Sequence, residues 1–269
     1  MCSSLTIGIS CLDTTLGRVL ENASLAALPH AKLLVIQPAQ GDEVRLPSEQ
    51  KALLESLGYQ WVMQHQRGLS RSRNALLEHC ETELLLISDD DVTFRAQDIK
   101  AASCWLESRP EIALLSGQYE KQGSLSHKGY ARAPHRHTRQ TRRNIASVEM
   151  LLRVGLIPDE VRFDTGFGLG ALFPAGEEAL FAEALARRGA ALYYAPFCLA
   201  SHPKLSTGDR RDEAFYVTRG ALQYALDGWR GLLRLPRMLF AQRQRSGLSA
   251  WRVARAMLQG FWAARRSRR

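Results

Sequence analysis

The chain has 269 residues, of which 45% are hydrophobic and 23% charged, and it carries a formal net charge of +9. This composition is typical of a globular protein with room for one α/β domain and an appendage. No run approaches the roughly 18 apolar residues that a membrane span needs, and no basic flank with an apolar signal core precedes the first strand-like segment. We therefore expect a cytoplasmic protein. Its five cysteines are scattered without a CxxC spacing, which argues against a disulfide framework and against a zinc site.

Strand-like and helix-like segments alternate along most of the chain, which predicts an α/β fold with a mainly parallel sheet covered by helices. Strands are expected at 5–11, 32–37, 60–64, 84–87, 112–118 and 191–194. Helices are expected at 15–27, 48–57, 70–80, 97–108 and 179–188. The third of these is expected to begin with Ser70 as its cap. No Gly-x-Gly-x-x-Gly follows the first strand and no Gly-Lys-Ser/Thr loop is present, so neither a dinucleotide fold nor a P-loop ATPase is indicated.

Three consecutive carboxylates, Asp89, Asp90 and Asp91, follow the apolar run at 84–87. A buried parallel strand delivers the residues after it to the carboxyl edge of the sheet, where α/β proteins bind ligands. Adjacent acids repel one another, and a hard divalent cation is the simplest way to stabilise them. The pattern predicts a Mg²⁺ or Mn²⁺ site for a phosphorylated substrate. The alternative is a solvated acidic turn, in which Asp bonds its own backbone.

The segment 121–143 contains seven Lys or Arg residues and three His residues, and it has no acid and little apolar periodicity. One interpretation is a mobile surface loop that closes over a polyanionic substrate. The other, which we favour, is a solvated, disordered insertion. His135 and His137 lack a nearby third ligand and are not expected to bind a metal.

The second half of the chain supplies a matching set of candidate groups. The stretch 163–170 is rich in glycine and aromatic residues and suits a close approach of backbone to a ligand. The paired acids Glu177 and Glu178 precede an apolar-periodic segment, so they are expected at a helix N-terminus. The helix dipole explains one acid there, and the second suggests a chemical role. His202 is expected in a loop, where a neutral imidazole can complete an oxygen-rich metal shell.

Taken in order, these parts resemble family 2 glycosyltransferases of the GT-A fold over residues 5–205. The resemblance rests on five motifs, at 68–74, 89–91, 163–170, 176–178 and 202. It implies a GT-A-like, Rossmann-like fold and a metal-dependent, inverting transfer of a sugar from a UDP- or GDP-sugar donor to a saccharide or lipid-linked acceptor. The basic C-terminal segment is similar to the region after the catalytic domain in transferases of bacterial surface-polysaccharide clusters.

The resemblance also implies a metal and donor site. The family's DxD motif falls on Asp89 and Asp91, with Asp90 between them. These residues would hold Mg²⁺ or Mn²⁺ on the sugar-nucleotide diphosphate and touch the ribose. His202 matches a histidine often found near the metal.

Two further motifs of the family carry binding and catalysis. Its Arg-Asn pair falls on Arg73 and Asn74, near the nucleotide, and its acidic pair falls on Glu177 and Glu178. One of the two glutamates would be the general base, because the acceptor hydroxyl must lose its proton as it attacks the anomeric carbon. The second acid of the family's pair is often Asp, so the sequence does not choose between them.

Two positions depart from the family's pattern. Gln37 follows the second strand, where the family usually has an acid that reads the nucleobase. Asp13 follows the first strand, where a Thr-Tyr-Asn type of sequence is common. We assign both side chains to nucleotide-sugar binding as substitutes.

The predicted organisation is a catalytic domain at 1–207 followed by a basic amphipathic tail at 208–269. Within the catalytic domain, 1–118 forms the nucleotide-binding half and 119–207 the acceptor half.

The segment 219–269 contains twelve arginines and a single acid, Asp227, so the rest of the chain is close to neutral. Two stretches, 220–239 and 250–266, alternate apolar residues, tryptophans among them, with Arg at helical spacing. Such helices suit the headgroups of an anionic membrane, which predicts peripheral attachment to the cytoplasmic face of the inner membrane. The alternative is a helical hairpin packed on the catalytic domain. We expect no nucleic-acid partner, although nucleic-acid binding is a further option for so basic a segment.

Two rival interpretations belong to other classes of protein. The stretch 85–93 also fits the strand and DxDxT pattern of haloacid-dehalogenase-like phosphatases, and 208–213 mimics their late acidic motif. In that family the nucleophilic Asp normally follows the first strand, whereas this triplet follows about the fourth. A non-catalytic module that binds anions or membranes through its tail would leave the ordered acids unexplained.

Overall fold

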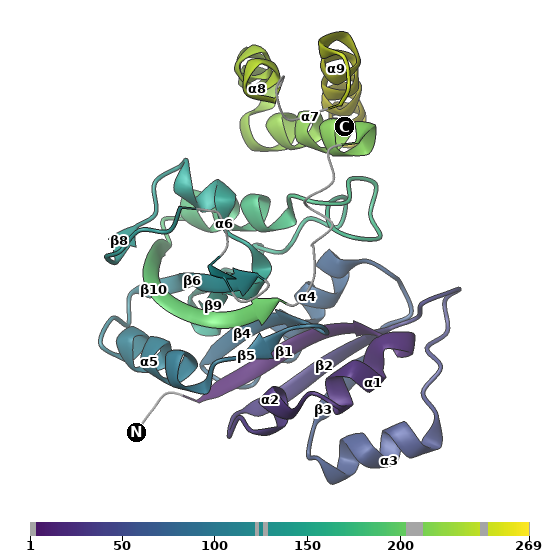
Figure 1. Cartoon of the computed structure of the whole chain (residues 1–269), viewed down its shortest axis with the longest axis vertical. Helices are drawn as coiled ribbons and strands as arrows, with labels where there is room; N and C mark the ends of the chain where they lie inside the picture. The colour runs from purple at the N-terminus through teal and green to yellow at the C-terminus, as the bar shows by residue number, and fades with distance from the viewer. Residues whose placement is uncertain (1–3, 122–123, 126–128, 203–211, 243–246, 269) are drawn as a thin grey trace.

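A curled sheet runs through the first three quarters of the chain, and a layer of C-terminal helices lies beyond one of its faces (Figure 1). The computed structural model describes residues 4–121, 124–125, 129–202, 212–242 and 247–268. Within these residues the strands follow the order β3-β2-β1-β4-β9-β6-β10-β5, with β7 on β6 and β8 on β10. The strands are β1 (Leu5–Leu12), β2 (Ala31–Gln37), β3 (Gln60–Met63), β4 (Leu84–Asp89), β5 (Thr93–Phe94), β6 (Ile112–Lys121), β7 (Ser124–Leu125), β8 (His135–Arg136), β9 (Met150–Arg153) and β10 (Ala191–His202).

Most of the long strands pair in parallel, as expected. β1 lies between β2 and β4, β2 also pairs with β3, and β6 pairs with β10, all in parallel. β9 joins the two groups because it pairs antiparallel with both β4 and β6. The predicted fold class, a mainly parallel α/β sheet flanked by helices with a helical C-terminal tail, is confirmed.

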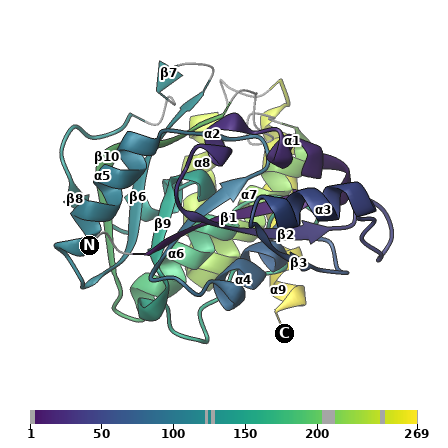
Figure 2. The same cartoon turned by 90° about the horizontal axis from the view of Figure 1, so that it is seen from below.

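Alternation along the strands sends apolar side chains to both faces of the sheet. Leu34 and Ile36 pack in one core with α1 (Leu16–Leu20), α2 (Ala23–Ala26), α3 (Ser48–Ser56) and α5 (Ala96–Glu107). Leu33 and Val35 pack in the other with α4 (Leu69–His79) and α6 (Glu177–Arg187). Figure 2 views the molecule from the first of these sides. Short 3₁₀ turns lie at Asp13–Thr15, Thr141–Asn144, Ser147–Glu149 and Val154–Leu156.

Several expected elements differ from the structure in detail, and the strands β5, β7, β8 and β9 were not expected. The helix expected at 15–27 is two helices, because the side chain of Asn22 accepts from the Leu25 amide and starts α2 anew. Gly68, not Ser70, occupies the N-cap of α4. β4 extends to Asp89. β10 extends to His202, so this histidine ends a strand instead of lying in a loop.

The basic segment 121–143 is part of the fold where the structure describes it, which corrects the expectation of a disordered insertion. β8 pairs with β10 at Tyr193 and Tyr194. The His137 ring lies 2.8 Å from the Ser116 hydroxyl and 3.0 Å from that of Thr141. Positions 122–123 and 126–128 lie outside the described residues.

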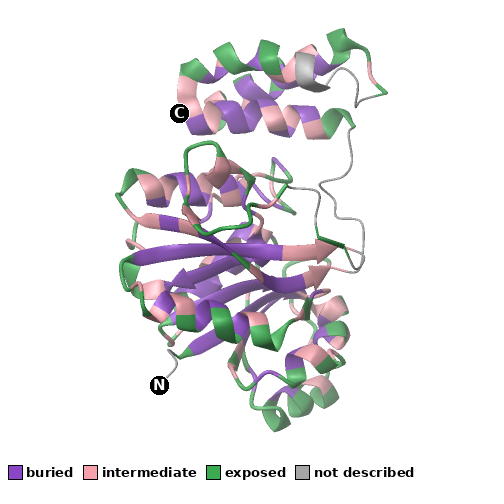
Figure 3. Cartoon of the chain, turned by 60° about the vertical axis from the view of Figure 1, so that its left-hand side comes forward, coloured by how far each residue is buried: buried purple, intermediate pink, exposed green. Residues whose placement is uncertain are grey.

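The C-terminal helices form a hairpin that covers the α6 side of the molecule (Figure 3). They are α7 (Glu213–Asp227), a 3₁₀ segment η6 (Gly228–Arg234), α8 (Leu235–Gln242) and α9 (Ala250–Ser267). The helix expected at 220–239 is interrupted at Gly228, whose φ of 57° ends α7. No helix in the described part of the chain is long and apolar enough to cross a membrane.

Two glycines bring the backbones of α7 and α9 into contact. A Cβ atom on Gly220 would lie 1.8 Å from the carbonyl oxygen of Met257, and one on Gly260 would lie 1.8 Å from that of Val217. Only glycine allows so close a crossing. The predicted boundary between 207 and 208 falls outside the described residues, and the one between 118 and 119 falls within β6.

Candidate active site

The Arg73 guanidinium joins three carboxylates from two other elements. Arg73 lies on α4 and only 1% of it is exposed. Its Nη1 lies 2.7 Å from Glu177 Oε1 and 3.4 Å from Glu178 Oε1, both at the start of α6. Its Nη2 lies 3.3 Å from Asp89 Oδ1, at the end of β4. Because a buried charge requires partners, this arrangement holds the donor and acceptor halves of the predicted site together.

The two glutamates of α6 have different environments. The side chain of Glu177 is 4% exposed, whereas that of Glu178 is 20% exposed. Burial raises the pKa of Glu177 to about 7, with help from the charge of Glu178 and against the charge of Arg73. Glu177 Oε2 is buried and has no hydrogen-bond partner among the described residues. Glu178 is therefore the acid that a substrate can reach.

The acidic triplet meets His202 because β5 and β10 pair at Thr93 and Ser201. His202 Nε2 lies 3.2 Å from Asp91 Oδ1. The hydrogen bond from His202 lowers the pKa of Asp91. Burial raises the pKa of Asp90, although a hydrogen bond with Thr15 opposes the change. Asp90 and Asp91 line an open hollow of about 400 Å³.

The donor set at this edge fits a hard divalent cation with few protein ligands. In the described part of the chain, no group of three or more His, Cys, Asp and Glu side chains is close enough to hold a metal ion. Asp91 and His202 form a pair of potential ligands, while Asp89 faces Arg73. Mg²⁺ takes one or two protein carboxylates and fills its other positions with water and substrate phosphate, so Asp91 supplies the carboxylate that such a site requires. The neutral imidazole of His202 can complete the shell.

Gln37 and Asn74, which the sequence assigns to nucleotide binding, form hydrogen bonds with the backbone of nearby segments. Gln37 is buried, and its Nε2 donates to the carbonyls of Gln66 and Gly68, while its Oε1 accepts from the Gly68 amide. The Asn74 amide donates to the Phe163 carbonyl at 2.9 Å and accepts from the Phe163 amide at 2.7 Å. Both amides are thus engaged within the protein.

Asp13 also holds a loop. Its carboxylate accepts from the backbone amides of Ala39 at 3.0 Å and Arg45 at 3.1 Å. These bonds fix the chain that follows β2 against the end of β1. Asp13, like Gln37, therefore shapes the edge of the sheet where β1 and β2 end.

The stretch 163–170 lies beside the glutamates, and Ser70 holds it there. Ser70 Oγ donates to the Phe167 carbonyl at 2.6 Å. Gly168 has a φ of 102°, and a Cβ on it would lie 2.9 Å from Ser70 Oγ and 3.2 Å from Glu177 Cδ. Sequence patterns indicated the glycine-rich stretch but not its contact with Ser70.

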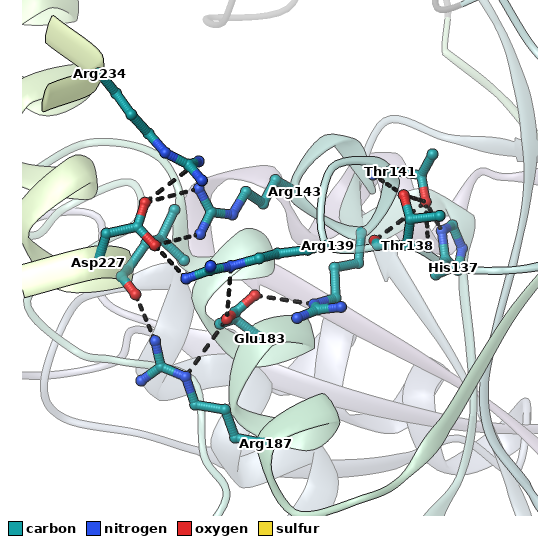
Figure 4. A network of polar contacts seen from close by, with 11 residues as sticks. His137, Thr138, Arg139, Thr141, Arg143, Glu183, Arg187, Asp227 and Arg234 are labelled. Atoms are coloured by element: carbon teal, nitrogen blue, oxygen red, sulfur yellow. Dashed lines mark hydrogen bonds and ion pairs between the residues drawn. The ribbon is translucent and has the colours of Figure 1, made fainter. Parts of the chain in front are cut away.

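Sequence reasoning also missed a network of arginines around Asp227 and Glu183 (Figure 4). Asp227 ends α7, and its carboxylate oxygens form ion pairs with three guanidinium groups. The nitrogen–oxygen distances are 2.5 Å to Arg139, 2.7 Å to Arg143 and 3.3 Å to Arg234. Glu183 of α6 is paired with three arginines, namely Arg139, Arg142 and Arg187. The network ties the basic segment and the C-terminal helices to α6. Its only sequence signal was the solitary acid in the arginine-rich tail.

The acids at 208–213 that mimic the late motif of phosphatases have structural roles in α7 where the structure describes them. Asp212 accepts from the Phe215 amide as the N-cap, and Glu213 pairs with Arg252 at 3.1 Å. Asp209 lies outside the described residues.

No protein-family model matches the chain, and no curated protein matches it. Solved structures of Staphylococcus aureus TarS are similar to it. TarS 1–349 superposes with a TM-score of 0.62 over 97% of this chain and 83% of that one, at 13% identity. The same fragment in complex with UDP-GlcNAc gives a TM-score of 0.60 over 90% and 73% of the two chains, at 14% identity. A complex of the fragment with UDP gives 0.57 over 90% and 72%, at 13% identity. At such identities the similarity establishes a shared fold.

Proposed function

We propose that this chain is a glycosyltransferase of the hexosyltransferase type, metal-dependent and inverting. It moves a sugar from a nucleotide-sugar donor to a saccharide or lipid-linked acceptor in cell-surface polysaccharide synthesis. The observation that carries the proposal is the Arg73 cluster, in which one buried cation holds Asp89 beside Glu177 and Glu178. The fold shared with TarS, whose structures hold UDP-GlcNAc and UDP, supports a nucleotide-sugar donor and makes UDP the first nucleotide to test.

In this proposal Glu178 is the general base. Its carboxylate is partly exposed, lies at the N-terminus of α6 and is next to Arg73, so it can accept a proton from an acceptor hydroxyl. Glu177 is a positioning residue, because it is buried and bound to Arg73. Arg73 keeps both glutamates in place while its other end holds Asp89.

The donor diphosphate lies against Asp89, Asp91 and His202. Asp91 and His202 would hold Mg²⁺ or Mn²⁺, and the ion when bound neutralises charge that the leaving nucleoside diphosphate gains. Asp90 borders the same edge. Arg73 adds a fixed positive charge behind Asp89, in a preorganised position that needs no rearrangement during the reaction.

Gln37, Asn74 and Asp13 belong to the proposed nucleotide-sugar site through the backbone that they hold. Gln37 fixes the chain at Gln66 and Gly68, and Asp13 fixes the chain at Ala39 and Arg45. Substitutions at these positions should therefore change donor affinity together with local stability.

Calorimetric titration with UDP and with GDP, each with and without Mn²⁺, tests the proposal. Wild type should bind one nucleotide in a metal-dependent manner, and Asp89→Ala/Asp91→Ala should abolish that binding. Asp159→Ala, a change at an exposed acid distant from the triplet in sequence, is the control and should bind like wild type. If the protein binds neither UDP nor GDP and hydrolyses p-nitrophenyl phosphate in a metal-dependent manner, the haloacid-dehalogenase-like phosphatase would be favoured instead.

A further inference from the structure

The helix α9 is apolar on two faces, and packing explains only one of them. Its inner face is buried in the hairpin and consists of Val253, Ala256, Met257, Gly260, Phe261 and Ala264. Its outer face carries an exposed stripe at helical spacing, consisting of Trp251, Arg255, Leu258, Trp262 and Arg266. Trp251 is 75% exposed and Leu258 is 43% exposed. A helix that only stabilised the hairpin would place polar residues there.

Trp229 of η6 extends this surface. It is 51% exposed, and its ring lies 5.3 Å from that of Trp262. The Arg265 guanidinium lies 4.4 Å from the Trp229 ring and 5.3 Å from the Trp262 ring. The tryptophan face, defined as Trp229 with the outer stripe of α9, therefore combines aromatic rings with cations.

The tryptophan face is strongly basic. No acid occurs between Gly228 and the C-terminus. Arg252 and Arg268 pair with acids of neighbouring elements, whereas Arg255 and Arg266 form no ion pair with any residue that the structure describes. These two cations are thus available to an external anion.

We propose that the tryptophan face docks on an anionic lipid bilayer. Tryptophan is suited to the headgroup region because it has an apolar body and a polar N–H, and each Arg near an anionic surface is attracted to its lipid headgroups. Leu258 lies in the centre of the stripe, where it suits an acyl boundary and has no role in contacting nucleic-acid phosphates. Exposed apolar rings and unpaired cations on one helix face are together the chemistry of an interfacial helix.

The end of α9 connects the helix that carries this face with the stretch 163–170 beside the candidate active site. Arg268, at the end of α9, pairs with Asp164, and its guanidinium lies 5.8 Å from the Phe167 ring. Both partners belong to the stretch 163–170 that lies beside Glu177. Figure 1 shows α9 in the layer farthest from α3. The membrane inference does not depend on the proposed reaction, although a lipid-linked acceptor would suit both.

Vesicle flotation with the full chain tests the inference. Wild type should float with POPC vesicles that contain POPG and should stay in the bottom fraction with vesicles of pure POPC. High salt should release it from the anionic vesicles. Trp251→Ser/Leu258→Ser/Trp262→Ser and Arg255→Glu/Arg266→Glu should each reduce binding at least tenfold. The matched control is Leu53→Ser/Leu57→Ser, which removes comparably exposed leucines at α3 and should bind like wild type.

The single variant Trp251→Ser keeps the test valid if the triple variant does not fold, and it should still lower vesicle affinity measurably. Titration with UDP separates this inference from the proposed function, because every variant should bind UDP like wild type. Flotation that is equal for wild type and the stripe variants would overturn the inference. So would tight binding to RNA, measured by gel shift, without binding to vesicles.

Discussion

Arg73 donates to Glu177 across 2.7 Å although the two residues are 104 positions apart in the chain. The bond connects α4 with α6, which pack in the same core on one face of the sheet. Both groups are almost fully buried, and Arg73 is the cation that Glu177 contacts inside the protein. Loss of Arg73 would therefore leave a buried carboxylate without its counter-charge.

Arg73→Met should destabilise the protein by about 3–5 kcal/mol, because Glu177 then stays buried without that compensation. Chemical denaturation measures the effect. Arg71→Met, two residues away on the same helix and partly exposed, is the matched control and should stay within about 0.5 kcal/mol of wild type. Equal stability of the two variants would contradict the role given to Arg73.

Glu178→Gln should lower turnover of the nucleotide-sugar by about 10²–10⁴ and leave UDP affinity unchanged, because it removes the proposed base alone. Glu177→Gln should lower the unfolding free energy and reduce turnover less. Release of nucleoside diphosphate and calorimetry measure these effects. If Glu178→Gln retained turnover and Glu177→Gln lost it, Glu177 would be the base and Glu178 the positioning residue.

Stability should fall as the pH is lowered from 6.5 towards 4, because His137 is neutral in the folded protein. Burial, with the charges of His135 and Arg142, lowers its pKa from 6.5 to about 4. The unfolded chain therefore binds a proton in this window that the folded chain does not, which costs up to about 1.4 kcal/mol per pH unit. Denaturation at several pH values should give a flatter profile for His137→Asn. An identical profile in both proteins would exclude His137 as the cause.

Asp227→Asn should loosen the C-terminal hairpin from the basic segment. The carboxylate is 3% exposed and pairs with three arginines, so its loss removes the buried carboxylate that Arg143 and Arg234 contact, while Arg139 keeps Glu183. Hydrogen exchange should increase at 137–144 and 228–234, with a loss of about 2–4 kcal/mol of stability. Asp159→Asn, at an exposed acid, should change neither region.

Gly260→Ala should force α7 and α9 apart, because its Cβ would overlap the Val217 carbonyl oxygen. We expect the free energy of unfolding to fall by about 1–3 kcal/mol, as measured by thermal or chemical denaturation. Gly17→Ala provides a control on another helix, where no atom lies within 4 Å of the added Cβ. That change should be neutral or slightly stabilising, since Ala favours helix over Gly. A neutral Gly260→Ala would contradict the close crossing.

The proposed membrane docking and the proposed nucleotide binding depend on separate residues, so the two sets of tests do not confound one another. The tryptophan face lies on α9 and η6, while the proposed donor edge lies at β4 and β10. The end of α9 links the helical layer to the glycine-rich stretch, because Arg268 touches Asp164 and Phe167.

The alternation of strand-like and helix-like segments predicted β1, β2, β3, β4, β6 and β10 and most of the helices, but not the short strands β5, β7, β8 and β9. Strands such as β2 are buried on both faces and form continuous apolar runs, and that signal is local. Element ends were less predictable, because they depend on partners. His202 belongs to a strand only because β6 and β5 lie on either side of β10 there.

The sequence by itself determined the fold class, the positions of the acidic and glycine-rich motifs, and the basic character of the C-terminal segment, because composition and periodicity are carried by neighbouring residues. Only the tertiary structure decided which charges meet. Arg73 pairs with Glu177, 104 positions away, as well as with Asp89, and Asp227 pairs with arginines from the segment expected to be disordered. The physical reason is that a buried charge is stabilised by whichever opposite charge the packing brings within hydrogen-bond distance, and no local pattern encodes that choice.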